Sequence, residues 1–200
     1  EIPLRLVGSE MCIRDRNHTV SEVTRLFDEY KFGEAGRELY NFIWNDFCDW
    51  YIEISKVALN GDDEELKARK QENLIWILDQ ILRLMHPIMP FVTEKLWLSM
   101  PHEGKSIMTA KYPETHAEFE NKQADSDMAF LIEVIKAVRN IRMEVNAPMS
   151  SQIDIMIQLD DEANKHILDD NAEYVENFLH PKDLQLSLIH ISEPTRRRGI

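Results

Sequence analysis

The chain has 200 residues, a formal net charge of −13 and 44% hydrophobic residues. This length predicts one large or two small domains, and the apolar content is enough for a core. No apolar run is long enough to cross a bilayer, so we expect no membrane partner. The acidic balance disfavours attraction of nucleic acid to the whole surface, although a local basic stripe can still contact phosphate.

The two ends of the chain can be encoded by opposite strands of one DNA segment. Residues 6–16 and 186–196 are the two translations. Such an inverted repeat resembles the transposase end and adapter used in sequencing-library preparation. We therefore expect residues 1–16 and 186–200 to be adapter-derived, non-native, weakly packed and without function. Residues 17–185 are then the natural segment, which we interpret as part of a longer protein.

The cysteine usage predicts a reducing compartment. Cys12 lies in the suspected adapter and Cys48 stands alone in a helical pattern. Neither a disulfide framework nor a paired zinc-type spacing is present. We expect a cytoplasmic protein in which Cys48 is a small core residue rather than a nucleophile.

Hydrophobic periodicity predicts helices over the first part of the segment. A short helix over 20–30 precedes a turn at 31–33, and the strongest pattern spans 34–59. Its apolar seam consists of Leu39, Ile43, Phe47, Trp50, Ile54 and Val57, with Tyr40, Trp44 and Tyr51 beside the seam. A short loop then leads into a helix over 63–86, which makes the two long helices antiparallel neighbours.

Two prolines, Pro87 and Pro90, interrupt the helical pattern because proline lacks a backbone donor. We expect a short helix over 91–100 and an irregular stretch over 102–121, with 106–112 extended. A helix over 125–144 follows and stops at Asn146-Ala147-Pro148.

After Pro148 the period changes from helical to alternating. Residues 153–158 predict a half-buried strand, 162–169 and 172–178 predict helical pieces, and 183–185 begin a second strand. The expected fold is mainly α. An antiparallel helical bundle over 17–147 is followed by a small, truncated α/β segment over 148–185.

Aromatic and basic residues near the start of the long helix form the first candidate site. Aromatic residues at helical spacing are mostly core, which we expect of Phe47 and Trp50. Tyr40, Trp44 and Tyr51 lie at the edge of the pattern, where an aromatic ring can stack on an unpaired base. Arg37 precedes them and can donate two hydrogen bonds to a phosphate or a base edge.

Three basic residues on a later helix form the second candidate site. Lys136, Arg139 and Arg142 are three residues apart and therefore share a helix face. One interpretation is a solvated face, and the other is contact with RNA phosphate, which adds affinity without sequence preference.

No catalytic constellation or metal site is predicted. Asp46, Asp49 and Glu53 share a helix face, but no histidine joins them at metal-ligand spacing. His86 is interpreted as a helix cap. The sequence contains no glycine-rich phosphate loop and no zinc-protease motif.

Three blocks of the sequence carry a resemblance to a known family. Residues 37–44 (RELYNFIW) and 47–53 (FCDWYIE) resemble the anticodon-binding domain of the valyl-tRNA synthetase family. Residues 86–97 (HPIMPFVTEKLW) resemble a block shared with the leucyl and isoleucyl synthetases, and 138–144 (VRNIRME) resemble a third block. The resemblance covers nearly all of residues 17–185.

The resemblance implies part of a cytoplasmic class I synthetase that joins valine to tRNA(Val) with ATP and Mg²⁺ and edits mischarged products. The HIGH and KMSKS signatures that hold ATP in the family are absent, so we expect no catalytic residue and no cofactor in this segment. The resemblance also implies that a monomer binds the anticodon stem-loop of the tRNA. Arg37, Tyr40 and Trp44 would lie near the loop, and Lys136, Arg139 and Arg142 on backbone phosphate.

Two alternatives stay open from the sequence. One is a leucyl or isoleucyl homologue, because the proline block is common to the group. The other is a helical scaffold that binds protein partners through its aromatic edge and does not bind RNA.

Overall fold

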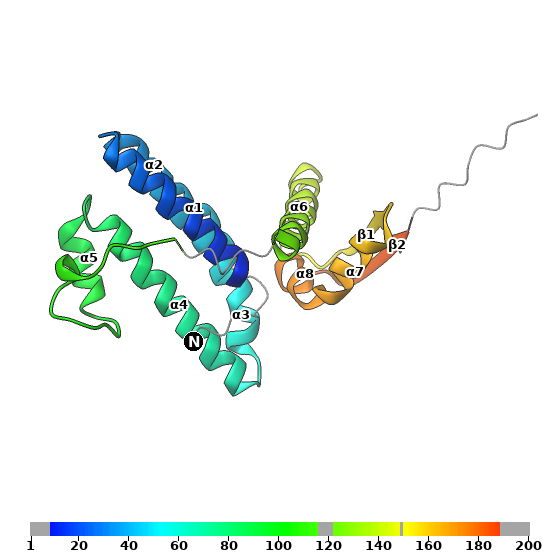
Figure 1. Ribbon diagram of the computed structural model, residues 1–200. Coiled ribbons are helices and arrows are strands. Elements are labelled where there is room, and N and C mark those ends of the chain that lie inside the picture. The colour runs from blue at the N-terminus through cyan, green and yellow to red at the C-terminus, as the bar shows by residue number, and fades with distance from the viewer. Residues whose placement is uncertain (1–8, 116–121, 149, 189–200) are drawn as a thin grey trace, which may run out of the picture. The chain divides into compact units, whose positions relative to one another are not determined.

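The structure is a computed structural model that describes residues 9–115, 122–148 and 150–188 (Figure 1). The chain divides into two compact units, residues 1–125 and 126–200. In order, the elements before the division are α1 (Ser9–Asp28), α2 (Phe32–Asn41), the wide helix η1 (Phe42–Ile52), α3 (Glu53–Asn60), α4 (Glu64–Met85), α5 (Pro90–Trp97) and the 3₁₀ turn η2 (Ile107–Thr109). They are followed by α6 (Lys122–Glu144), β1 (Asp154–Leu159), α7 (Glu162–Asp170), α8 (Ala172–Leu179) and β2 (Asp183–Leu188).

The predicted fold class is confirmed: the first unit is helical, and the second carries two strands. The boundary differs from the one expected after residue 147, because most of α6 belongs with the α/β segment. Arginine side chains of α6 donate to backbone carbonyls of α8 and of the loop after α6, which explains this grouping.

Helices α1 and α2 form an antiparallel hairpin around one apolar cluster. Val23, Leu26, Ala35, Leu39 and Leu84 are buried together, so α4 also contributes to this cluster. Helix α1 ends with a hydrogen bond from Lys31 N to Leu26 O (2.8 Å) across Tyr30, whose φ is 60°. This six-residue closure is the Schellman ending of a helix.

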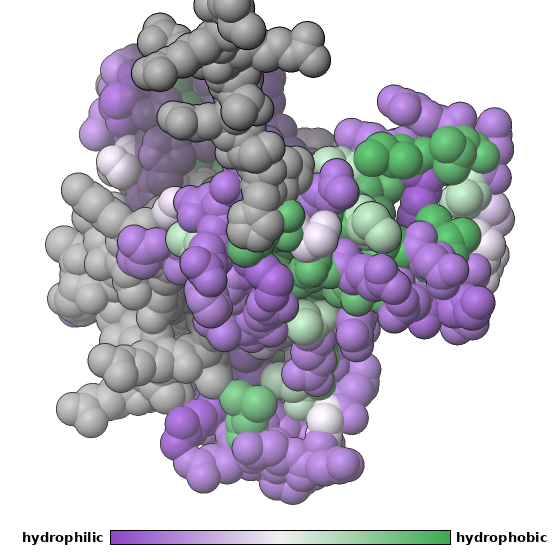
Figure 2. All heavy atoms as spheres, turned by 90° about the vertical axis from the view of Figure 1, so that its right-hand side faces the viewer, coloured by the Kyte–Doolittle hydropathy of each residue, from purple (hydrophilic) through white to green (hydrophobic). Residues whose placement is uncertain are grey.

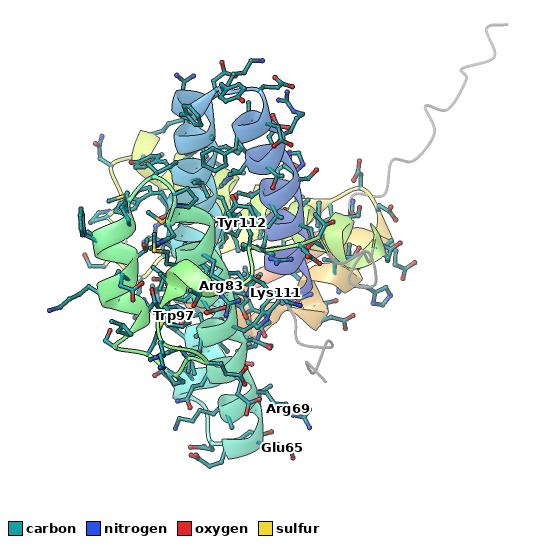
Figure 3. All side chains as sticks on the ribbon, turned by 60° about the vertical axis from the view of Figure 1, so that its left-hand side comes forward. Glu65, Arg69, Arg83, Trp97, Lys111 and Tyr112 are labelled. Carbon is teal, nitrogen blue, oxygen red and sulfur yellow. The ribbon has the colours of Figure 1, made fainter. Side chains whose placement is uncertain are left out.

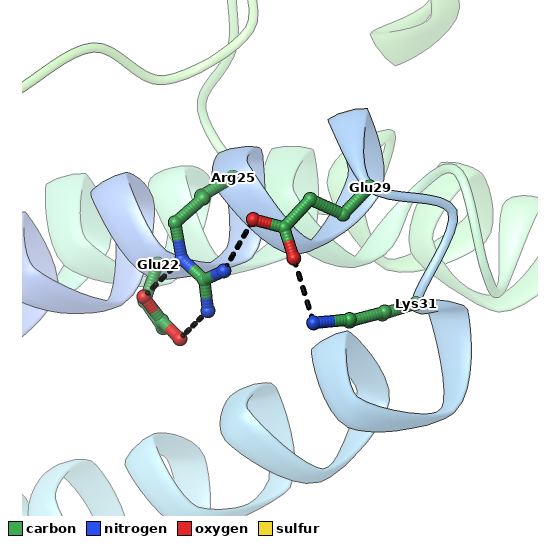
Figure 4. A network of polar contacts seen from close by, with 4 residues as sticks. All are labelled: Glu22, Arg25, Glu29 and Lys31. Carbon is green, nitrogen blue, oxygen red and sulfur yellow. Dashed lines mark hydrogen bonds and ion pairs between the residues drawn. The ribbon is translucent and has the colours of Figure 1, made fainter.

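An exposed ion-pair network spans the turn between α1 and α2 (Figure 4). Arg25 contacts Glu22 and Glu29 at 2.5 Å each, and Lys31 contacts Glu29 at 2.7 Å. The hydrogen bond from Arg25 lowers the pKa of Glu22, and hydrogen bonds from Lys31 and then Arg25 lower the pKa of Glu29. Any stability from these lowered pKa values is present at neutral pH and disappears as the carboxylates become protonated.

The expected helix over 34–59 is continuous but has a wide segment in its middle. In η1 the backbone hydrogen bonds span five residues instead of four, which makes it a π-helix. The wide turn places Phe42 and Phe47, five residues apart, in the same core cluster, together with Tyr51. Tyr51, expected beside the seam, is therefore fully buried.

Asp79 on α4 holds α5 in place through its carboxylate. Trp97 Nε1 donates to Asp79 Oδ1 at 2.7 Å, and Arg83 lies 2.9 Å from Asp79 Oδ2. Arg83 also donates to the Lys111 carbonyl at 3.4 Å, so the chain after α5 returns to α4 (Figure 3). Ile107 of η2 packs with Trp97. An extended conformation was expected over 106–112, but residues 107–109 form a short 3₁₀ turn.

The expectation of weakly packed ends is wrong for the described residues near both ends. Helix α1 begins at Ser9, whereas a start at residue 20 was expected. Arg16 is fully buried and donates to Gln80 Oε1 (2.6 Å) and the Glu114 carbonyl (2.7 Å). Residues 186–188 belong to β2. The adapter origin of the two ends stays a prediction, and residues 1–8 and 189–200 lie outside the described residues.

The second unit contains a parallel pair of strands joined by helices α7 and α8. Asp154 of β1 aligns with Asp183 of β2, and the register continues to Leu159 and Leu188. Strand β1 alternates as predicted, with Ile155 and Leu159 buried. A parallel pair needs a crossover connection, which the two helices provide.

None of the described helices is long and apolar enough to span a membrane. On the face drawn in Figure 2, hydrophilic side chains predominate and apolar side chains form small groups. This distribution agrees with the acidic composition.

We predict that Asp79→Ala destabilises the first unit by about 3 kcal/mol, because Trp97 Nε1 would lose its acceptor in a buried site and Arg83 its ion pair. Urea unfolding followed by tryptophan fluorescence measures the loss. Asp62→Ala, at an exposed position, is the matched control. Equal unfolding midpoints for the two variants would contradict the role given to Asp79.

Candidate nucleic-acid interface

Tyr40 and Trp44 form an exposed aromatic pair at the junction of α2 and η1. Their side chains are 62% and 56% exposed, and their rings are stacked with centroids 6.2 Å apart and planes at 11°. Residues four apart share a helix face, which explains the contact. The remaining exposed ring faces can stack on a planar ligand.

An apolar pocket of about 210 Å³ adjoins the aromatic pair. It is lined by Gly36, Leu39, Tyr40, Ile43, Trp44, Met85, Ile88 and Met89. The last three come from the end of α4 and from the proline corner. The sequence did not indicate their place in the site, because an apolar residue near a proline gives no sign of which helix it faces.

Arg37 supplies an exposed positive charge on the same side of α2. It lies three residues before Tyr40 and seven before Trp44, a spacing that places all three on one helical stripe. Among the described residues, no hydrogen bond or ion pair of the Arg37 side chain is found. We call Arg37, Tyr40 and Trp44 the α2 surface. The two rings are in contact, and the binding role of the three residues stays a prediction.

The basic stripe on α6 divides into residues with different environments. Lys136 is exposed. Arg139 is partly buried against α8, with its guanidinium carbon 5.1 Å from the ring centroid of Phe178 and Nη2 donating to the Phe178 carbonyl at 3.4 Å. Arg139 also lines a surface groove, described below, so one part of its side chain packs and another part faces the groove.

Arg142 is a correction to the expected phosphate contacts. Its side chain is only 2% exposed. Nη1 donates to the Leu179 carbonyl at 3.1 Å, and Nη2 donates to the carbonyls of Pro148 (2.8 Å) and Ser151 (2.6 Å). Buried backbone carbonyls need donors, and a guanidinium can serve several at once. Arg142 is therefore a structural residue that holds the end of α6, the following loop and α8 together.

A groove of about 800 Å³ follows the exposed side of α6. It is lined by Lys136, Arg139, Asn140, Arg142, Met143, Asn146, Ala147 and Pro148. We call this the α6 groove. The α2 surface belongs to the first unit of the chain and the α6 groove to the second.

Neither surface has the features of a catalytic or metal centre. Within residues 9–115, 122–148 and 150–188, no group of three or more histidine, cysteine or acidic side chains could hold a metal ion. Burial, and to a smaller extent Asp49, raises the pKa of the Cys48 thiol. A raised pKa leaves less thiolate, the nucleophilic form, at neutral pH.

Comparisons with known proteins agree on one family. The family described as the anticodon-binding domain of tRNA ligase matches residues 12–157. The valine–tRNA ligase of Lactobacillus johnsonii is 89% identical over 171 residues, covering 86% of this chain and 20% of that protein. The valine–tRNA ligase of Lactobacillus acidophilus is 85% identical over 180 residues, covering 90% and 20%. That of Bacillus licheniformis is 51% identical, with the same coverage. The chain spans about a fifth of the length of these relatives.

We predict that Cys48 reacts slowly with a disulfide reagent at neutral pH, because burial disfavours its thiolate. The rate is measured in a Cys12→Ser variant and compared with that of glutathione and of the same variant in denaturant. A native rate equal to the denatured rate would contradict the prediction.

We also predict that Arg142→Ala destabilises the second unit by about 3 kcal/mol, because three backbone carbonyls lose a charged donor. Hydrogen exchange of β1 and β2 amides should accelerate by about two powers of ten. Lys182→Ala, which removes a side chain that is 67% exposed, is the matched cationic control. Unchanged exchange in Arg142→Ala would restore a surface role for the residue.

Proposed function

The chain belongs to the family of anticodon-binding domains of tRNA ligases, and on this premise we propose that it binds the anticodon stem-loop of tRNA(Val) within a valine–tRNA ligase. The α2 surface is the observation that carries the proposal. It combines two stacked, exposed aromatic rings with an exposed arginine, on a chain whose net charge is −13.

The chemistry of the α2 surface suits an unpaired RNA loop. A base that stacks on an aromatic side chain contributes about 1–3 kcal/mol, whatever its identity. Arg37 can donate two hydrogen bonds to a phosphate or to a base edge, which adds geometry to the attraction. The adjoining apolar pocket can receive the edge of a base that has left the loop stack.

Lys136 and Arg139 supply the phosphate contacts in this proposal. They lie on α6 and line its groove, whereas Arg142 is withdrawn from the interface for the reasons given above. Contacts of this kind release counterions from RNA, so the affinity they provide falls as salt rises. They position the strand and carry no sequence information themselves.

The remaining parts of the reaction belong to the longer protein. We propose that the intact ligase attaches valine to its tRNA with ATP and Mg²⁺, and that this segment orients the tRNA. The described residues do not fit a site for ATP or Mg²⁺, because they offer neither a glycine-rich phosphate loop nor a cluster of acidic ligands. A monomeric, cytoplasmic protein is part of the same proposal.

Valine is favoured over leucine or isoleucine because the relatives with 89%, 85% and 51% identity are all named valine–tRNA ligases. The protein-interaction scaffold is disfavoured by the family match over residues 12–157. Neither alternative has an observation of its own in its favour.

We predict that Trp44→Ala and Arg37→Ala each weaken binding of an anticodon stem-loop hairpin of tRNA(Val) by roughly tenfold, because they remove a stacking surface and a cation. Fluorescence anisotropy at about 50 mM and about 200 mM salt measures the affinity and its salt slope. Phe91→Ala, which removes an aromatic side chain that is 89% exposed on α5, is the matched control and should bind as the unchanged chain does.

A hairpin with a changed anticodon separates recognition from charge attraction. The proposal expects weaker binding of the changed hairpin and a loss of that difference in Trp44→Ala. Equal affinity for both hairpins would overturn anticodon recognition. Undetectable binding at low salt would overturn RNA binding altogether.

A further inference from the structure

We propose that the α6 groove holds an unpaired nucleotide of the bound RNA, with Asn140 reading the base and Met143 supporting its face. This inference rests on the proposed function and goes beyond it, because it assigns base recognition to a helix that was expected to contact only phosphate. Asn140 and Met143 are absent from the sites that the sequence suggested.

Three side chains of different chemistry follow one side of α6. Lys136, Asn140 and Met143 occupy positions i, i+4 and i+7, so they form one stripe on the exposed side of the helix. A cation, an amide and a thioether thus follow each other over two turns. Met143 is 68% exposed, so its thioether is accessible to a ligand in the groove.

The lining of the α6 groove is basic. Its lining residues include three basic side chains and no acidic one, although the whole chain has a net charge of −13. A positive groove on an acidic protein selects an anionic ligand at that place. Arg142 is only 2% exposed, whereas Lys136 is exposed and Arg139 is partly exposed, so these two are the accessible cations of the groove.

Ala147 and Pro148 close the groove at one end. Helix α6 ends with Asn146 at φ 54° and a hydrogen bond from Ala147 N to Arg142 O at 2.8 Å. The Arg142 side chain holds the Pro148 carbonyl at 2.8 Å. The wall made by Ala147 and Pro148 is therefore fixed by Arg142, which acts as a positioning residue and leaves the groove open before any ligand arrives.

The size and chemistry of the groove suit a nucleotide. The groove volume of about 800 Å³ lies within the range of about 300–1,000 Å³ that suits ligands of drug size, and a nucleotide is of this size. An asparagine amide presents a donor and an acceptor side by side and can pair with a base edge, most simply that of adenine. Met143 and Pro148 offer apolar contacts to the base face. An acidic peptide can also use the two cations and the amide, but it lacks the combination of a phosphate and a planar base edge that the cations and Asn140 match.

The experiment couples a protein variant to an RNA change. Binding is measured for the 200-residue chain with the anticodon stem-loop hairpin and with hairpins in which each loop base in turn is removed to leave an abasic site. Asn140→Ala should weaken binding of the complete hairpin by roughly tenfold, the effect of one lost base contact. It should have no further effect once the base that it contacts is absent, which is the signature of a direct interaction.

Matched variants separate reading from phosphate contact and from folding. Met143→Ala should weaken binding several-fold without changing the salt slope, whereas Lys136→Ala should reduce that slope by about one phosphate contact. Ile141→Ala is the control, because Ile141 is similarly exposed (58%) on the same turn of α6 but does not line the groove. Circular dichroism checks that all four variants keep their helices.

Each outcome decides the inference. Additive effects of Asn140→Ala with every abasic hairpin would overturn base reading, even if the chain binds RNA through the α2 surface. Displacement of the hairpin by polyglutamate at equal charge concentration, in the unchanged chain and with no effect of Asn140→Ala, would identify the groove as a general anion site and also overturn it. Failure of the unchanged chain to bind any hairpin would overturn both this inference and the proposed function.

Discussion

Burial of aromatic and aliphatic side chains along residues 35–58 is the constraint on which the first unit depends. The wide helix η1 lets Phe42 and Phe47, five residues apart, enter the same core cluster, and Ile43 packs against that cluster. Tyr40 and Trp44 stay outside it, with 62% and 56% of their surface exposed. The candidate surface therefore lies on the side of the helix that the core leaves free.

Within each unit, a buried arginine joins elements that are distant in the sequence. In the second unit the Arg142 guanidinium joins three backbone carbonyls. In the first unit the Arg16 guanidinium joins α1 to α4 and to the chain near residue 114, and burial lowers its pKa to about 10. A pKa of about 10 keeps the Arg16 guanidinium charged at neutral pH. The number of basic residues in the sequence therefore overstates the positive charge that is available to RNA.

The sequence predicted the helical fold and the α/β segment because helical and alternating periods are long and clear in this chain. It also predicted the shared stripe of Arg37, Tyr40 and Trp44, since spacing alone determines a helix face. It could not predict the wide turn, because hydrogen bonds over four or five residues leave similar apolar patterns. It could not separate Arg142 from Lys136 either, since equal spacing gives no information on which side of α6 the rest of the chain packs.

The wide helix η1 also affects where the length of this segment can change. Removing one residue from an ordinary α-helix turns everything beyond it by about a quarter of a turn around the helix axis. In η1, loss of one residue between Phe42 and Phe47 would instead leave these two side chains four residues apart, which is the spacing that an α-turn places on one face. Tyr51 and Ile54, which lie beyond the wide turn, would then keep their place in the core. A one-residue deletion should therefore disturb the packing less in η1 than in α4.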